Sequence, residues 1–257
     1  MANGLACWGY ALSVTCPARI ATRSILRAVP AKRLNDSVLG VLERPALAWM
    51  AGRLPAWVTS DHLTAAGFAG ALAAAVGYVA SRWSIQWLWL ASLGLLLNWF
   101  GDSLDGTVAR LRRIERPRYG FFVDHSCDLF AQALVFLALG CSPCARFGVA
   151  CLGLIAFLMA FVYTMIYAEV RGTFRITYFG FGATEIRALL VAGNLITLQV
   201  GVLDLGQWFA PLSRIRPVTM FEAGIAIVCA FTMPVLAMMA VREGRKLARE
   251  DPPKEPH

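Results

Sequence analysis

Four aspartates fall in one short stretch of the chain, with long apolar runs on both sides: Asp102, Asp105, Asp124 and Asp128. A carboxylate at membrane depth costs roughly 3 kcal/mol, so acids in such a setting are rare and are usually paired, metal-bound or functional. Ligand sets made only of oxygen suit Mg²⁺, Mn²⁺ or Ca²⁺. The stretch therefore predicts a divalent-cation site in an apolar part of the chain.

The first two acids share one helical face with small neighbours. At about 100° per residue, Asp105 lies about 60° from Asp102, and Gly106 and Ala109 lie within about 40° of Asp102. These two small residues leave room for a flat or bulky ligand against the helix backbone. Arg110 adds a forked donor that suits phosphate.

The other two acids follow a glycine on a second helix. Gly120, Asp124 and Asp128 are spaced i, i+4 and i+8, which is one helical face. Two antiparallel helices would point all four carboxylates at one another, and bare carboxylates would repel and take up protons. One or two divalent cations remove that conflict, and Mg²⁺ is usually completed by substrate phosphates.

This segment resembles the signature of the CDP-alcohol phosphotransferases: Asp-x-x-Asp-Gly-x-x-Ala-Arg, a spacer, then Gly-x-x-x-Asp-x-x-x-Asp. Every fixed position of that signature is present between Asp102 and Asp128. The spacer, residues 111–119, is at the long end of the family's range. A departure lies upstream, where Ser60 and Asp61 stand in place of the Pro and Asn that precede Leu-Thr in many members.

The resemblance implies a reaction and a role for each residue. An acceptor hydroxyl attacks the phosphorus of a CDP-alcohol, such as CDP-diacylglycerol, and CMP leaves, as a step of phospholipid biosynthesis. Asp102, Asp105 and Asp124 are then ligands of Mg²⁺ or Mn²⁺, expected as two ions, and Asp128 is the general base and a further ligand. The resemblance also implies a homodimer, and a nucleotide-binding set made of Gly106, Ala109, Arg110 and Gly120.

A second polar set lies further along the chain and concerns the acceptor. Arg171, Arg175 and Arg187 suit a phosphorylated acceptor, such as an inositol or glycerol phosphate. Residues 182–185, Gly-Ala-Thr-Glu, instead resemble the Gly-Pro-Thr-Glu of the aminoalcohol branch, which uses CDP-choline or CDP-ethanolamine and diacylglycerol. Ordinary boundary charges with local ion pairs are a third interpretation, and the sequence leaves all three open.

The chain as a whole predicts an all-α integral membrane protein. More than half of its 257 residues are hydrophobic, which is too many for an ordinary soluble domain. An amphipathic helix at residues 36–54 is expected to lie in the headgroup plane. Six transmembrane helices of about 20 residues follow, expected at residues 62–80, 86–110, 120–139, 147–168, 184–202 and 220–241.

Three regions are expected along the chain. Residues 1–35 form an N-terminal extension without a signal-peptide pattern, residues 36–247 form the membrane domain, and residues 248–257 form a disordered tail. The Cys141-Ser-Pro-Cys144 pair lies in a loop and lacks the neighbours of a zinc site. Whether these two thiols form a disulfide stays open.

Orientation follows from the basic residues. Of the 24 Lys and Arg residues, 20 fall on the side that holds both termini and the four aspartates. The positive-inside rule places that side in the cytoplasm, and a bacterial inner membrane is expected. A net charge of +8 is also compatible with nucleic-acid binding, but no basic soluble domain is present to hold it.

A rival class of function is an ion or proton transporter that uses the carboxylates as its pathway. Transporters commonly show inverted repeats with broken helices at mid-membrane. The chain shows no such repeat, and its acids lie near the expected cytoplasmic ends of the spans. The transferase is therefore the favoured interpretation.

Overall fold

The computed structural model describes residues 32–34, 38–175, 182–205 and 218–253. The chain divides into two units, residues 1–30 and 31–257, and every described element belongs to the second. Two short strands are β1 (Lys32–Leu34) and β2 (Thr173–Arg175). The described helices are α1 (Val38–Arg53), α2 (Ser60–Ala80), η1 (Ile85–Trp87), α3 (Leu88–Leu111), α4 (Pro117–Gly140), α5 (Phe147–Arg171), α6 (Ala183–Val200) and α7 (Met220–Glu250).

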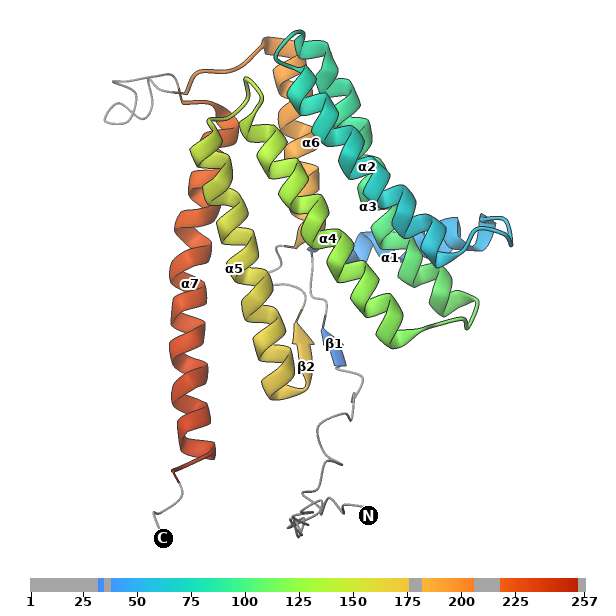
Figure 1. Ribbon diagram of the computed structural model, residues 1–257, viewed down its shortest axis with the longest axis vertical. Helices are drawn as coiled ribbons and strands as arrows, with labels where there is room; N and C mark the ends of the chain where they lie inside the picture. Colours follow the sequence, from blue (N-terminus) through green and yellow to red (C-terminus); the bar gives the residue numbers. More distant parts are fainter. Residues whose placement is uncertain (1–31, 35–37, 176–181, 206–217, 254–257) are drawn as a thin grey trace, which may run out of the picture. The chain divides into compact units, whose positions relative to one another are not determined.

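Four of these helices, α2, α4, α5 and α7, are long and apolar enough to cross a membrane. The other two expected spans form α3 and α6, and both helices carry buried polar side chains, among them Asp105 on α3 and Arg187 on α6. In the ribbon, α5 runs beside α4 on one side and α7 on the other (Figure 1). A multi-pass membrane protein is confirmed, and the count of six spans stays a prediction.

Helices α2 and α3 pack backbone against backbone. A Cβ on Gly70 would lie 2.5 Å from the backbone nitrogen of Asn98, and one on Gly101 would lie 2.4 Å from the carbonyl oxygen of Leu63. Small residues at such crossings let membrane helices approach closely. Asn98 secures the pair by donating its side-chain N–H to the carbonyl of Gly67 (3.0 Å). This close approach sets the start of α2 beside the acidic half of α3.

Helix α1 covers the end of α3. Leu47 and Ala51 are buried in a cluster with Leu104 of α3, whereas Trp49 is 60% exposed. The guanidinium of Arg112, just after α3, donates to the carbonyls of residues 54, 55, 56 and 58. The link between α1 and α2 is thereby tied to α3. The helix predicted at residues 36–54 is present, and its placement in the headgroup plane stays a prediction.

The opposite end of the bundle holds a second network. Arg146, before α5, donates its backbone N–H (2.7 Å), Nε (2.7 Å) and Nη2 (3.0 Å) to the carboxylate of Glu222 on α7. Thr219 caps α7 and donates its hydroxyl to the carbonyl of Cys144 (2.5 Å). Cys141 and Cys144 are free thiols, and burial raises the pKa of Cys144 to about 11.

Two features differ from the sequence-based expectations. β1 pairs in parallel with β2, with Lys32 opposite Thr173, although residues 32–34 belong to the expected extension and no strand was predicted. Such short strands carry too few residues for an alternating pattern. α7 also continues to Glu250, past the expected end of its span and into the expected tail. The last turns of α7 are polar and remain helical without an apolar run. Lys246 and Glu250, spaced i, i+4, pair on this part of the helix.

Candidate active site

Three of the four predicted aspartates converge. Carboxylate oxygens of Asp102 on α3 and of Asp124 and Asp128 on α4 lie within 4.8 Å of one another. All three side chains are partly buried, so their charges are incompletely screened by solvent. Two segments of the sequence thus deliver their acids to one point, as the helical spacing predicted.

A narrow cavity contains this cluster, and three helices line it. α2 contributes Thr64 and Gly67, α3 contributes Asn98 beside its two aspartates, and α4 contributes Cys127 beside its own. A Cβ on Gly67 would come within 3.3 Å of the backbone nitrogen of Asp102, so glycine keeps this wall close to the acids. The sequence had not predicted that α2 lines the site.

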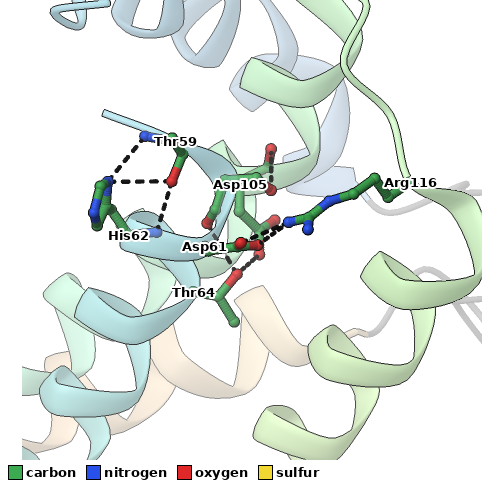
Figure 2. Close-up of polar contacts among 7 residues, drawn as sticks. Thr59, Asp61, His62, Thr64, Asp105 and Arg116 are labelled. Atoms are coloured by element: carbon green, nitrogen blue, oxygen red, sulfur yellow. Dashed lines mark hydrogen bonds and ion pairs between the residues drawn. The ribbon is translucent and has the colours of Figure 1, made fainter. Parts of the chain in front are cut away.

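Asp105 lines the same cavity but is held by protein groups. Its side chain is buried, and Thr64 donates its hydroxyl to Oδ2 at 2.6 Å (Figure 2). The backbone N–H of Gly106 donates to Oδ1. Ser60 donates its hydroxyl to the backbone carbonyl of Asp105 (3.0 Å). The first turn of α2 therefore fixes both the backbone and the carboxylate of this residue.

Arg187 of α6 lies against the acid cluster, and its side chain is only 4% exposed. Its Nη1 donates to Oδ2 of Asp102 at 2.6 Å, and its Nη2 lies 3.4 Å from Oδ1 of Asp128. Its Nε is buried, without a hydrogen-bond partner among the described residues. The sequence grouped Arg187 with the acceptor-binding arginines, and the structure adds this contact with the predicted metal ligands.

The other two arginines of that group have different settings. Arg171 pairs with Glu243 and, at 2.5 Å, with Glu250, both on α7. These contacts match the interpretation of local ion pairs at a charged boundary. The backbone of Arg175 lies in β2, and its side chain lies outside the described part of the structure.

The predicted nucleotide-binding residues lie on the two expected helices. Arg110 is exposed at the end of α3, and its guanidinium lies 3.2 Å from where a Cβ on Gly106 would be. Its Nη2 donates to the hydroxyl of Thr107 (3.2 Å). Ala109 is partly buried, and a Cβ on Gly120 of α4 would have open space around it.

The start of α2 carries further polar contacts. Thr59 and His62 form a reciprocal capping box, which gives His62 a structural role (Figure 2). Asp61 accepts two hydrogen bonds from Nη2 of Arg116, at 2.6 and 2.5 Å, which join α2 to the residue before α4. These hydrogen bonds raise the pKa of Arg116 above its usual value. The residue that departs from the family pattern thus has a defined partner.

The donor set fits a hard divalent cation. The three converging groups supply only carboxylate oxygen, and the buried guanidinium of Arg187 compensates only part of their charge. Buried charges are costly unless they are paired or bound to metal. Asp102, Asp124 and Asp128 could together hold such an ion, and Asp105 lies in the same cavity.

Comparison with known proteins agrees with this arrangement. The family model for CDP-alcohol phosphatidyltransferase matches residues 57–217, which include the whole acidic segment, α6 and the start of α2. The chain therefore belongs to the CDP-alcohol phosphatidyltransferase family, as its signature residues indicated.

The individual relatives include two enzymes with different names. The chain is 24% identical over 198 residues to cholinephosphotransferase 1 of Gallus gallus, and 36% identical over 83 residues to phosphatidylinositol phosphate synthase of Cutibacterium acnes. It is 33% identical over 138 residues to an uncharacterized protein of Aquifex aeolicus. These matches cover 72%, 32% and 52% of this chain, and 56%, 38% and 66% of the respective relatives.

Proposed function

We propose that the protein is a membrane-bound CDP-alcohol phosphotransferase of phospholipid biosynthesis. It transfers a substituted phosphate group from a CDP-alcohol to the hydroxyl of an acceptor and releases CMP. The observation that carries this proposal is the convergence of Asp102, Asp124 and Asp128 within the matched family region. An oxygen-only site of this kind suits the charge of a nucleotide diphosphate held through divalent ions.

Asp102, Asp105, Asp124 and Asp128 are the proposed metal ligands, for two Mg²⁺ or Mn²⁺ ions. When bound, such ions neutralise charge on the diphosphate and stabilise the leaving phosphate. The cavity shared by the four acids supports this assignment. Asp105 already accepts hydrogen bonds on both oxygens, so Thr64 and the Gly106 amide fix its orientation before any ion arrives.

Asp128 is the proposed general base. In the transfer, an acceptor oxygen forms a bond to phosphorus, the bond from phosphorus to the CMP oxygen breaks, and the acceptor's proton passes to the Asp128 carboxylate. Its position beside Asp102 and Asp124 supports this role, because a base must lie next to the reacting phosphate. The nucleotide is proposed to lie along the helix faces that carry Gly106, Ala109, Arg110 and Gly120.

The acceptor is proposed to bind near Arg187. This residue contacts two acids that line the cavity and is the best placed of the three predicted acceptor-binding arginines, whereas Arg171 is engaged by α7. The sequence raised two acceptor classes, a phosphorylated polyol and diacylglycerol, and the relatives include both a phosphatidylinositol phosphate synthase and a cholinephosphotransferase. The second candidate is therefore an aminoalcohol phosphotransferase that uses CDP-choline or CDP-ethanolamine.

The proposed membrane arrangement has six spans, with α3 and α6 added to the four apolar helices. Their buried polar residues face other protein groups, which lets such helices cross a membrane. Both termini and the site are placed at the cytoplasmic side of a bacterial inner membrane, by the distribution of basic residues. Trp49, which is 60% exposed, supports an interfacial position for α1, and a homodimer is proposed from family resemblance.

One assay tests the proposal and separates its alternatives. Purified protein is incubated with CDP-diacylglycerol or CDP-choline, a panel of acceptors and Mg²⁺ or Mn²⁺, while CMP and the lipid product are measured. We expect metal-dependent CMP release that needs one matched donor and acceptor. Diacylglycerol as the productive acceptor would establish the aminoalcohol branch. Ion flux through reconstituted protein without CMP release with any pair would support the transporter and overturn the proposal.

A further inference from the structure

Arg187 is a charged residue in an unusual environment. Its guanidinium is almost completely removed from solvent and contacts two of the three acids that converge in the cavity. A buried arginine normally uses its forked donors fully, because an unpaired buried polar group costs about 1–3 kcal/mol. Here the Nε has no hydrogen-bond partner among the described residues. Among the described residues, the guanidinium is therefore held only through Nη1 and Nη2, by Asp102 and Asp128.

The charge of the cluster is incomplete. Asp102, Asp124 and Asp128 carry three carboxylates, and Arg187 brings one positive charge. One guanidinium and one divalent cation together would neutralise the three acids. The hydrogen bond from Arg187 occupies Oδ2 of Asp102, so an ion that takes this oxygen must compete with the guanidinium.

We propose that Arg187 is the internal counter-ion of the acid cluster in the metal-free protein, and that it lowers the affinity of the cluster for the divalent ion. This inference rests on the proposed metal site. Without metal, the guanidinium limits repulsion between the helices that carry the acids. With metal bound, the same positive charge is repelled by the ion, and the guanidinium gives up its hold on Asp102. Arg187 is thus a positioning residue that stabilises the acid cluster in the metal-free protein and opposes the binding of the ion.

This role differs from a contact with the acceptor in a measurable way. Removing a residue that only binds acceptor phosphate would leave metal affinity unchanged when no acceptor is present. Removing a residue that only supports the fold would lower stability equally with and without metal. The proposed counter-ion destabilises the metal-free protein when it is removed, and strengthens metal binding at the same time.

The test uses the full chain in detergent and needs no turnover. Binding of Mn²⁺ is measured by electron paramagnetic resonance, and the melting temperature is measured in EDTA and in saturating Mn²⁺. For Arg187→Gln we expect Mn²⁺ to bind at least about tenfold more tightly, together with a lower melting temperature in EDTA. The rise in melting temperature on adding Mn²⁺ should exceed that of the unmodified protein.

Two further variants keep the test decisive. Arg187→Lys retains the charge but cannot bridge two acids, so it should fold and show an intermediate increase in the stabilisation by Mn²⁺. Arg146→Gln removes the arginine of the ion pair with Glu222 and should leave Mn²⁺ affinity unchanged. Unchanged or weaker Mn²⁺ binding in both Arg187 variants would overturn the inference. Absence of Mn²⁺ binding by the unmodified protein would instead overturn the proposed metal site.

Discussion

Arg146 and Arg187 each pair with carboxylates of the helix bundle, Arg146 from an exposed position and Arg187 from a buried one, yet the two pairs have opposite character. Glu222, 3% exposed, accepts three hydrogen bonds from Arg146 and one from the backbone N–H of Thr219 (3.3 Å). One positive charge there pairs with one negative charge, and both carboxylate oxygens of Glu222 accept hydrogen bonds. Arg187 faces three acids, and one of its own donors has no partner among the described residues.

The difference separates a contact that supports the fold from the proposed ligand-binding site. A buried ion pair is tolerated when its geometry is good and its remaining polar atoms are satisfied, as at Glu222. An excess of buried negative charge with an orphaned donor is unfavourable unless a further group completes it. The same guanidinium chemistry thus serves structure near the α4–α5 loop and, in our proposal, controls ion binding beside the cavity between α2, α3 and α4.

The largest effect is expected at the acid that the proposal makes the base. Asp128→Asn keeps the size of the side chain but removes its capacity to take a proton. Turnover, measured as CMP release, should fall by about 10²–10⁴-fold. The melting temperature in EDTA should stay near that of the unmodified protein or rise, because one of the repelling carboxylates is gone. Retained turnover would remove Asp128 from the base role.

Glu222→Gln should give the next largest effect, and on stability rather than turnover. Breaking a fully buried ion pair costs about 3–5 kcal/mol, and the cost here is reduced because Arg146 is 42% exposed. We expect a clear drop in melting temperature, with Mn²⁺ affinity and the activity of the folded fraction unchanged. A matching loss of Mn²⁺ affinity would mean that the two ends of the bundle are energetically coupled. The role of Glu222 would then not be purely structural.

Thr64→Val tests whether α2 belongs to the site. Valine keeps the shape of threonine and removes the hydroxyl that donates to Asp105 at 2.6 Å. A lost hydrogen bond to a charged group is worth about 1.5–3 kcal/mol, so kcat/KM should fall by about tenfold or more. Thr64→Ser should restore it. Thr164→Val, which removes a hydroxyl bonded within α5, is the matched control and should leave kcat/KM unchanged. Equal effects of the two valine variants would contradict a special role for Thr64.

The sequence predicted the acids of the site better than their surroundings. Asp124 and Asp128 are one helical turn apart, so their shared face follows from helix geometry alone. The contact between Arg187 and Asp102 joins positions 85 residues apart, and no local pattern specifies it. Thr64 was equally hidden, because a single hydroxyl in an apolar helix is common and its role depends on the glycine-mediated approach of α2 to α3.

In the fold, too, features set within one segment were predicted better than contacts between residues far apart in the chain. Apolar runs predicted the helices closely, since length and hydropathy act within one segment. The parallel pairing of β1 with β2 depends on residues far apart in the chain, and three residues leave no periodic signal. Likewise, the sequence predicted the same acceptor-binding role for Arg171 and Arg187. Only the tertiary structure shows that Arg171 pairs with acids of α7 and that Arg187 pairs with Asp102.

The smallest effect is expected at a third ion pair, between Asp61 and Arg116. Its two side chains are 47% and 54% exposed, so water and salt screen the attraction that the buried pairs retain. Asp61→Asn should leave the melting temperature unchanged and alter kcat by less than about twofold. The measurement is repeated at low and high salt, where any small difference should vanish at high salt. A large, salt-independent loss of turnover would show that Asp61 acts on the substrate. The first turn of α2 would then carry a ligand-binding charge rather than one that only supports the fold.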